Sequence, residues 1–184
     1  MEIKKIHIPG LLVIEPDVFG DSRGYFMETF RESKYKEIGI NCNFVQHNES
    51  ASNKGVIRGL HYQLEPHAQA KLVRVIQGQV FDVALDLRLG SPTFGKWFGV
   101  VLSGENKKQF FIPKGFAHGF SVLQNNTIFE YKCDEIYTPE SERGIIYDDP
   151  KLNIEWMVKP ENAIISEKDK HNPSFKDAEY NFNF

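Results

Sequence analysis

The segment Phe81-Asp-Val-Ala-Leu-Asp-Leu87 alternates strictly between two kinds of side chain. Its large apolar residues occupy the odd positions, whereas Asp82, Ala84 and Asp86 occupy the even positions. Because successive side chains of a strand point to opposite faces, this period of two residues predicts a β-strand. An apolar run at residues 72–76 precedes it, and Gln77-Gly78-Gln79 between the two supplies the glycine of a tight turn, which predicts a β-hairpin.

Short strands separated by turns are expected along much of the chain. Further candidates, each bounded by Gly, Pro or Asn, are residues 97–103, 109–112, 116–123 and 127–133. The 15 Phe residues and the aromatic content of 13% also favour strands. Short strands at regular spacing predict an all-β sandwich or barrel.

Helices are expected to be few and short. Residues 31–38 end at Gly39, which suits the position just after a helix, and Tyr35 and Ile38 give this segment a small apolar stripe. Ser166 is followed three residues later by Asp169, which predicts a short capped turn near the C-terminus. Neither helix is long enough to organise a fold.

The composition is that of an ordinary globular chain. Of its 184 residues, 41% are hydrophobic and 26% are charged, which argues against disorder. A chain of this length buries one sizeable core and leaves little for a second. We therefore expect a single domain over residues 1–184.

Charge and hydropathy exclude several classes of partner. The net charge is -3, and no basic run exceeds Lys4-Lys5 or Lys107-Lys108, whereas a nucleic-acid binder needs clustered basic residues. No apolar run approaches the roughly 18 residues that span a bilayer, and the N-terminus leads into no signal-peptide core. We expect a cytoplasmic protein with no membrane partner, and with Cys42 and Cys133 as reduced thiols.

Two histidines lie in informative contexts. His61 belongs to Gly55-Val-Ile-Arg-Gly-Leu-His-Tyr-Gln63, and His118 belongs to Pro113-Lys-Gly-Phe-Ala-His-Gly119. A glycine, five residues and a histidine, followed downstream by Pro-x-Gly-x-x-His, resemble the two motifs of the cupin superfamily. The resemblance implies an all-β fold, a cupin-type double-stranded β-helix jelly roll with a few short helices.

The metal ligands of metal-binding cupins are incomplete in this chain. Those cupins carry a second histidine and a glutamate in the first motif, and here Gln63 and His67 occupy these places. An amide is a poor transition-metal ligand, and the carboxylate that balances the metal charge is missing. We therefore expect no metal and no other cofactor, with a metal-dependent cupin as the alternative. A histidine without a metal can act as a base.

Longer segments resemble one family within this superfamily, the dTDP-4-dehydrorhamnose 3,5-epimerases. The similarity runs in order from about residue 10 to residue 170. The matching segments are Phe19-Gly-Asp-Ser-Arg-Gly-Tyr-Phe26, residues 55–63, Lys71-Leu-Val-Arg-Val75, residues 81–88, Gly115-Phe-Ala-His-Gly-Phe120, Tyr131-Lys-Cys133 and Ser166-Glu-Lys-Asp169.

The resemblance implies cofactor-independent epimerisation of dTDP-4-dehydro-6-deoxy-D-glucose at C3 and C5. The C4 ketone acidifies the neighbouring hydrogens, so a base on one face, a cation at the enolate oxygen and an acid on the other face suffice. The resemblance also implies a homodimer. Alternatives are an enzyme that inverts C3 only on a related nucleotide-linked ketosugar, and a catalytically silent sugar-binding cupin.

Four residues match the catalytic set of the family. His61 matches the base and Asp169 the carboxylate that orients it, with Asp82 as a second candidate partner for the same ring. Tyr131 matches the proton donor, and Lys71 the cation that steadies the enolate. The ordinary alternatives are a structural histidine, a helix cap, a core tyrosine and a solvated strand end.

Nine further residues match positions that contact the substrate in the family. The arginines among them suit bidentate contact with phosphate, and Phe19 is a further stacking candidate. The nine are Arg23, Phe26, Glu28, Gln46, Asn48, Arg58, His118, Glu142 and Lys168.

The chain departs from the family pattern in three places. Gln46-His-Asn-Glu-Ser50 stands where the family has Gln-Asp-Asn-His-Ser. The acidic and the basic residue on either side of Asn48 have therefore exchanged positions, as His47 and Glu49. Ile136 replaces a tyrosine, and Met157 replaces a proline. These changes leave the nucleotide contacts and the choice between double and C3-only epimerisation open.

Overall fold

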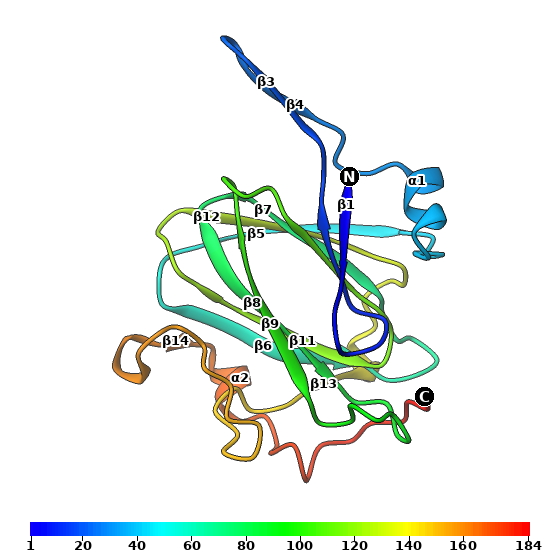
Figure 1. The fold of residues 1–184 in the computed structure, drawn as a ribbon. Coiled ribbons are helices and arrows are strands. Elements are labelled where there is room, and N and C mark those ends of the chain that lie inside the picture. Colours follow the sequence, from blue (N-terminus) through cyan, green and yellow to red (C-terminus); the bar gives the residue numbers. More distant parts are fainter.

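The computed structural model describes residues 1–184 as two facing β-sheets (Figure 1). The first sheet has six strands, all paired antiparallel. In spatial order they are β1 (Glu2–Lys5), β2 (Leu12–Glu15), β10 (Gln109–Ile112), β7 (Lys71–Gln77), β12 (Thr127–Cys133) and β5 (Gln46–Ser52).

The second sheet faces the first and carries the strand of the first histidine motif. Five strands pair antiparallel, and β14 (Ile164–Ile165) adds to β6 in parallel. In spatial order the five are β13 (Glu142–Gly144), β6 (Val56–Gln63), β11 (Phe116–Val122), β8 (Gln79–Asp86) and β9 (Trp97–Ser103). Two packed, mainly antiparallel sheets between which the chain crosses repeatedly form the expected cupin-type jelly roll, so the predicted fold class is confirmed.

The predicted hairpin around Gly78 is wrong. Strand β7 pairs with β10 and β12 in the first sheet, whereas β8 pairs with β11 and β9 in the second. Gly78 is therefore a corner where the chain crosses between sheets. Its φ of +80° suits glycine, and a β-carbon there would collide with Thr127.

The core explains the alternation of β8. Ala84 packs into a cluster between the sheets with Val73, Val75 and Phe110, while Val83 and its odd-numbered neighbours pack into a second cluster on the other side. Both faces of the strand are thus buried. Asp82 shares the inward face with Ala84, so the strand delivers a carboxylate to the space between the sheets.

Helical structure is limited, as predicted. Helix α1 (Glu32–Glu37) buries Tyr35, and α2 (Glu167–Lys170) follows Ser166, whose hydroxyl accepts a hydrogen bond from the Asp169 amide at 3.1 Å. Short 3₁₀ turns occur at Pro139–Ser141 and Pro160–Asn162. None of these helices has the length and apolar character that crossing a membrane requires.

A two-stranded hairpin projects from the sandwich (Figure 1). It consists of β3 (Val18–Asp21) and β4 (Gly24–Met27), which pair only with each other. Phe19 and Phe26 are 65% and 70% exposed, respectively. Large aromatic side chains grouped on a projecting element are typical of an interaction surface.

Candidate active site

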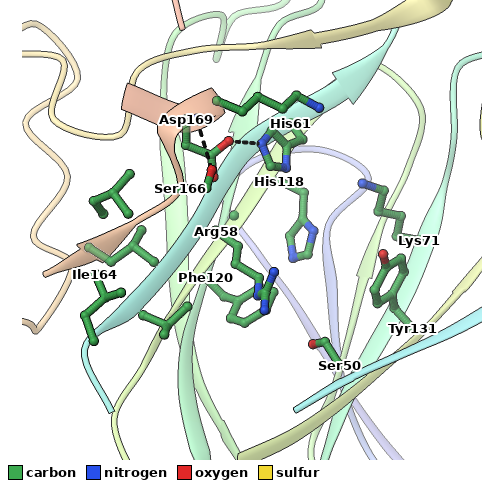
Figure 2. Close-up of a pocket in the computed structure, with 15 residues that line it drawn as sticks. Ser50, Arg58, His61, Lys71, His118, Phe120, Tyr131, Ile164, Ser166 and Asp169 are labelled. Carbon is green, nitrogen blue, oxygen red and sulfur yellow. Dashed lines mark hydrogen bonds and ion pairs between the residues drawn. The ribbon is translucent and has the colours of Figure 1, made fainter. Parts of the chain in front are cut away.

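A cavity of about 540 Å³ opens between the two sheets (Figure 2). The second sheet contributes His61 and His118, and the first contributes Lys71 and Tyr131. Asp169 reaches it from α2. The structure therefore brings all four residues of the expected catalytic set to one cavity.

His61 and Asp169 form a hydrogen-bonded pair. Nε2 of His61 lies 2.6 Å from Oδ1 of Asp169 (Figure 2). The other oxygen of Asp169 lies 3.4 Å from the backbone amide of Gly59. Burial opposes ionisation of Asp169, but the hydrogen bond and charge of His61 outweigh it and hold the pKa of the carboxyl below its usual value. An ionised carboxylate only accepts hydrogen bonds, so in the neutral imidazole Nε2 carries the proton and Nδ1 keeps a free lone pair.

Tyr131 and Lys71 lie on the wall formed by the first sheet. The Lys71 Nζ is 6.0 Å from the centre of the Tyr131 ring, and Figure 2 shows both polar ends at the cavity. Burial raises the pKa of Tyr131, so its hydroxyl retains a proton to donate at neutral pH. Burial lowers the pKa of Lys71, and the charges of Cys133 and Asp82 offset part of that change.

Asp82 does not pair with His61, which corrects the second candidate partner named from the sequence. Both carboxylate oxygens of Asp82 lie 3.0 Å from Nε2 of His118, and Asp82 is fully buried. The reason is register, because Phe120 and not His61 stands beside Asp82 in the ladder and His118 lies two residues away on the same face. Burial raises the pKa of Asp82, and His118 and Lys71 offset part of the rise. The cavity is thus lined by the His61–Asp169 pair and by His118, whose partner Asp82 lies buried behind it.

Gln63 has a structural role. Its side-chain nitrogen donates to the carbonyls of His67 at 2.7 Å and Ile136 at 3.1 Å, and its oxygen accepts from the amide of Thr138 at 2.7 Å. This amide therefore anchors the loop before β13. No group of three or more His, Cys, Asp or Glu side chains is placed to hold a metal ion.

Six of the nine expected substrate contacts lie at this site. Arg58, His118 and Lys168 line the main cavity. The other three line an adjoining cavity of about 420 Å³, which also contacts His61 and Tyr131. They are Gln46, Asn48 and Glu142.

The remaining three expected contacts are not brought to this cavity. Arg23 and Phe26 line a hollow on the projecting hairpin, where Arg23 pairs with Asp21 at 2.5 Å. Glu28 follows the hairpin and pairs with Arg31 at 2.7 Å. Within one chain these residues do not meet the catalytic set.

The exchange of His47 and Glu49 falls on the outer side of β5. Both are exposed, because they alternate with the partly buried Asn48. His47 Nε2 lies 2.9 Å from Glu130, which also binds Arg74 at 2.9 Å. His47 therefore meets Glu130 on the face opposite the Asn48 side chain, whereas Glu49 also borders the adjoining cavity.

The other departures lie near the rim or away from the cavity. Ile136 is 57% exposed, while the following Tyr137 donates through its hydroxyl to Glu142 at 2.7 Å. Glu142 also pairs with Lys168, so this carboxylate links two sides of the site. Met157 borders a different hollow.

Several residues of the site were not predicted from the sequence, and two of them bear on the chemistry. Ser50 and Phe120 both line the main cavity. Phe120 lies two residues after His118 on the same strand, so the two side chains share a face. This spacing could have identified Phe120 from the sequence. Ser50 has the same parity as Asn48, but recognising it required knowing that this polar segment is a strand.

Comparison with known proteins agrees with this geometry. The family model described as dTDP-4-dehydrorhamnose 3,5-epimerase matches residues 5–177. The chain belongs to this family. It is 54% identical to the dTDP-4-dehydrorhamnose 3,5-epimerase of Shigella flexneri over 181 residues, which cover 98% of this chain and 99% of the relative.

Solved structures of epimerases share the whole fold. One is the dTDP-6-deoxy-D-glucose-3,5-epimerase of Legionella pneumophila in complex with dTDP-4-keto-L-rhamnose, at 53% identity and a TM-score of 0.91, with 95% of this chain and 93% of that chain covered. A more distant one is a 3'-monoepimerase of Streptomyces bikiniensis in complex with dTDP-quinovose, at 31% identity and a TM-score of 0.85, covering 92% and 85%. The family fold therefore accommodates both double and single epimerisation.

Proposed function

We propose that this protein converts dTDP-4-dehydro-6-deoxy-D-glucose into dTDP-4-dehydro-L-rhamnose by inverting C3 and C5, without a cofactor. The observation that carries the proposal is the arrangement of His61 with Asp169 against Tyr131 with Lys71 across one cavity. The base and the acid come from opposite sheets. Such a site can remove a proton from one face of a sugar ring and return another to the opposite face.

His61 starts the reaction. Its unprotonated Nδ1 removes a proton from the carbon next to the C4 ketone, and the electrons of the C–H bond remain in the enolate that forms. The resulting imidazolium is stabilised by Asp169, which stays ionised because its pKa is low. Lys71 supplies positive charge beside the enolate oxygen without transferring a proton.

Tyr131 completes the inversion. Its phenol donates a proton to the opposite face of the same carbon, and the enolate electrons form the new C–H bond. One proton leaves and one enters, so the sugar is neither oxidised nor reduced. Afterwards His61 holds an extra proton and Tyr131 lacks one, and exchange with water resets both.

The rest of the site suits the nucleotide part of the substrate. Arg58 has no carboxylate partner and lines the main cavity, where its guanidinium is free to bind a diphosphate. Gln46 and Asn48 line the adjoining cavity, where their amides can donate to and accept from polar groups of the substrate. These residues, with His118, Glu142 and Lys168, form the substrate-binding set within one chain.

A homodimer of single-domain subunits accounts for the remaining three contacts. Arg23, Phe26 and Glu28 lie on or beside a hairpin that projects from its own sandwich, with its aromatic side chains exposed. A second copy gives this hairpin a surface to bury and places these residues at the partner's cavity. We further propose a cytoplasmic location for this dimer.

The test is incubation with dTDP-4-dehydro-6-deoxy-D-glucose in heavy water, followed by NMR. The expected result is deuterium at both C3 and C5 together with the L-configured ketosugar. Inversion at C3 alone would replace this proposal with the C3-only alternative. Binding without any exchange would identify a catalytically silent sugar-binding protein.

A further inference from the structure

The inward face of β5 carries a row of polar side chains. Gln46, Asn48, Ser50 and Ser52 are partly buried, and the residues between them are exposed. Because alternate residues of a strand share a face, all four point toward the space between the sheets. The inward face of this edge strand therefore forms a polar wall of the site.

Neighbouring members of the row have partners within the chain. Gln46 donates to Asn48 at 3.1 Å, and its oxygen accepts from the amide of Tyr137 at 2.8 Å. At the other end, Ser52 accepts a hydrogen bond from Arg58 at 3.2 Å.

Ser50 is the exception. Its hydroxyl oxygen is buried and has no hydrogen-bond partner. Only one other side-chain atom of the chain, the amide nitrogen of Asn172, shares this condition. Ser50 lines the main cavity, and Figure 2 shows its hydroxyl directed into it.

An unpartnered buried hydroxyl is costly for a folded protein. Losing its hydrogen bonds to water without replacement destabilises the fold, which is why nearly all buried polar groups are paired. A group of this kind on the wall of a ligand cavity is explained when the ligand provides the partner.

The position of Ser50 indicates which part of the ligand it meets. In the ladder, Asn48 stands opposite Tyr131 and Ser50 opposite Phe129. Two residues along a strand span about 7 Å, so Ser50 lies one such step from the level of the proton donor. It lies the same step from Ser52, which holds Arg58. Ser50 thus stands between the chemistry and the diphosphate.

We propose that the Ser50 hydroxyl donates a hydrogen bond to a substrate oxygen where the sugar ring joins the diphosphate. The inference rests on the proposed function and adds a positioning contact to it. The acceptor is either a ring or hydroxyl oxygen of the sugar or an oxygen of the diphosphate. Both are hydrogen-bond acceptors of suitable strength.

The test compares Ser50→Ala with the parent enzyme and with Ala51→Ser. The control adds a hydroxyl to the exposed face of the same strand. In Ser50→Ala we expect KM for the ketosugar to rise about 3- to 10-fold, which is the worth of one neutral hydrogen bond, with kcat within about twofold. The melting temperature should stay the same or rise, because no hydrogen bond within the protein is lost.

Binding of dTDP alone identifies the acceptor. If Ser50→Ala also weakens dTDP binding, the acceptor belongs to the diphosphate; if dTDP binds as before while KM rises, it belongs to the sugar. Either supports the contact. Unchanged KM and dTDP affinity, a lower melting temperature, or an equal effect of Ala51→Ser would overturn it. Activity of the parent enzyme in the same assay separates failure of this contact from failure of the proposed reaction.

Discussion

His61 and Asp169 are 108 positions apart in the sequence, yet their Nε2 and Oδ1 atoms are 2.6 Å apart. The contact depends on α2, where Ser166 caps the helix and Asp169 turns inward to be almost completely buried. The carboxylate is thus fixed before substrate arrives. A preorganised partner holds the imidazole in one orientation and one tautomer, which suits the proposed role of His61 as a base toward two carbons of one ring.

Replacing the base is the most direct test of this arrangement. His61→Asn should lower turnover by about 10² to 10⁴, the range for loss of a positioned acid or base, and leave the fold intact. Steady-state kinetics with circular dichroism of the same sample checks both. A folded variant that retains more than about a tenth of the parent rate would show that another group is the base.

The low pKa of Asp169 has a consequence for stability. Because its folded-state pKa lies below the unfolded value of about 3.9, ionised Asp169 stabilises the fold above that pH, and the contribution is lost as pH falls through the folded pKa. The stability difference between parent and Asp169→Asn should therefore be largest near neutral pH and shrink below about pH 4. Urea unfolding across this range measures it, and a difference independent of pH would contradict the assignment.

The hairpin proposal predicts complementation between two inactive variants. If Arg23 acts in the partner's cavity, each site combines the cavity of one subunit with the hairpin of the other. In a heterodimer of Arg23→Ala and His61→Asn, both changes then fall in one site and the other site is intact. Mixing and reassembling equal amounts gives half heterodimers, each with one intact site, so activity should recover to about a quarter of the parent. The control is a mixture of His61→Asn with Lys71→Ala, two changes in the same cavity. This mixture should recover no activity if each subunit supplies its own catalytic set.

The control mixture is expected to stay inactive. His61 and Lys71 line the same cavity of one chain, so a heterodimer of those variants carries one lesion in each site and stays inactive. Recovery in the Arg23 mixture and none in the Lys71 mixture is the expected pair of results. No recovery in either would place Arg23 in its own subunit's site or outside catalysis.

Metal removal tests the remaining cupin alternative. Because Gln63 is committed to three backbone hydrogen bonds, we expect treatment with a chelator and dialysis to leave turnover unchanged. Metal content by mass spectrometry is measured alongside. Stoichiometric metal whose removal abolishes turnover and whose return restores it would overturn the cofactor-free mechanism.

Sequence periodicity predicted several strands with apolar faces, but it missed the short apolar strand β2, the largely buried strand β6 and the polar strand β5. The bounds of β9, β10 and β12 agree with the structure. By contrast, β5 is Gln-His-Asn-Glu-Ser-Ala-Ser, with no apolar face, because its inward side meets a polar cavity instead of the core. Hydrophobic patterning cannot find a strand whose function is to present polar groups.

Pairing between distant strands was the other limit. Local turn chemistry at Gly78 suited a hairpin, but each neighbouring strand finds its partners in a different sheet. The same limit applies to Asp82, whose partner depends on the register of β8 against β11. The four residues proposed as catalytic were named through family resemblance, since no local pattern brings residues 61, 71, 131 and 169 together.

Tyr131 allows the two faces of the enolate to be separated. In Tyr131→Phe, His61 can still remove a proton and return a solvent deuteron to the same face, while the opposite face has lost its acid. Exchange should therefore outlast inversion, and deuterium should accumulate at C3 or C5 of unepimerised substrate in heavy water, as measured by NMR alongside product formation. Epimerisation at the parent rate would assign the donor to another group or to water. If exchange and inversion fell together, Tyr131 would position the substrate instead, a role compatible with its place beside Lys71 and one step from Ser50.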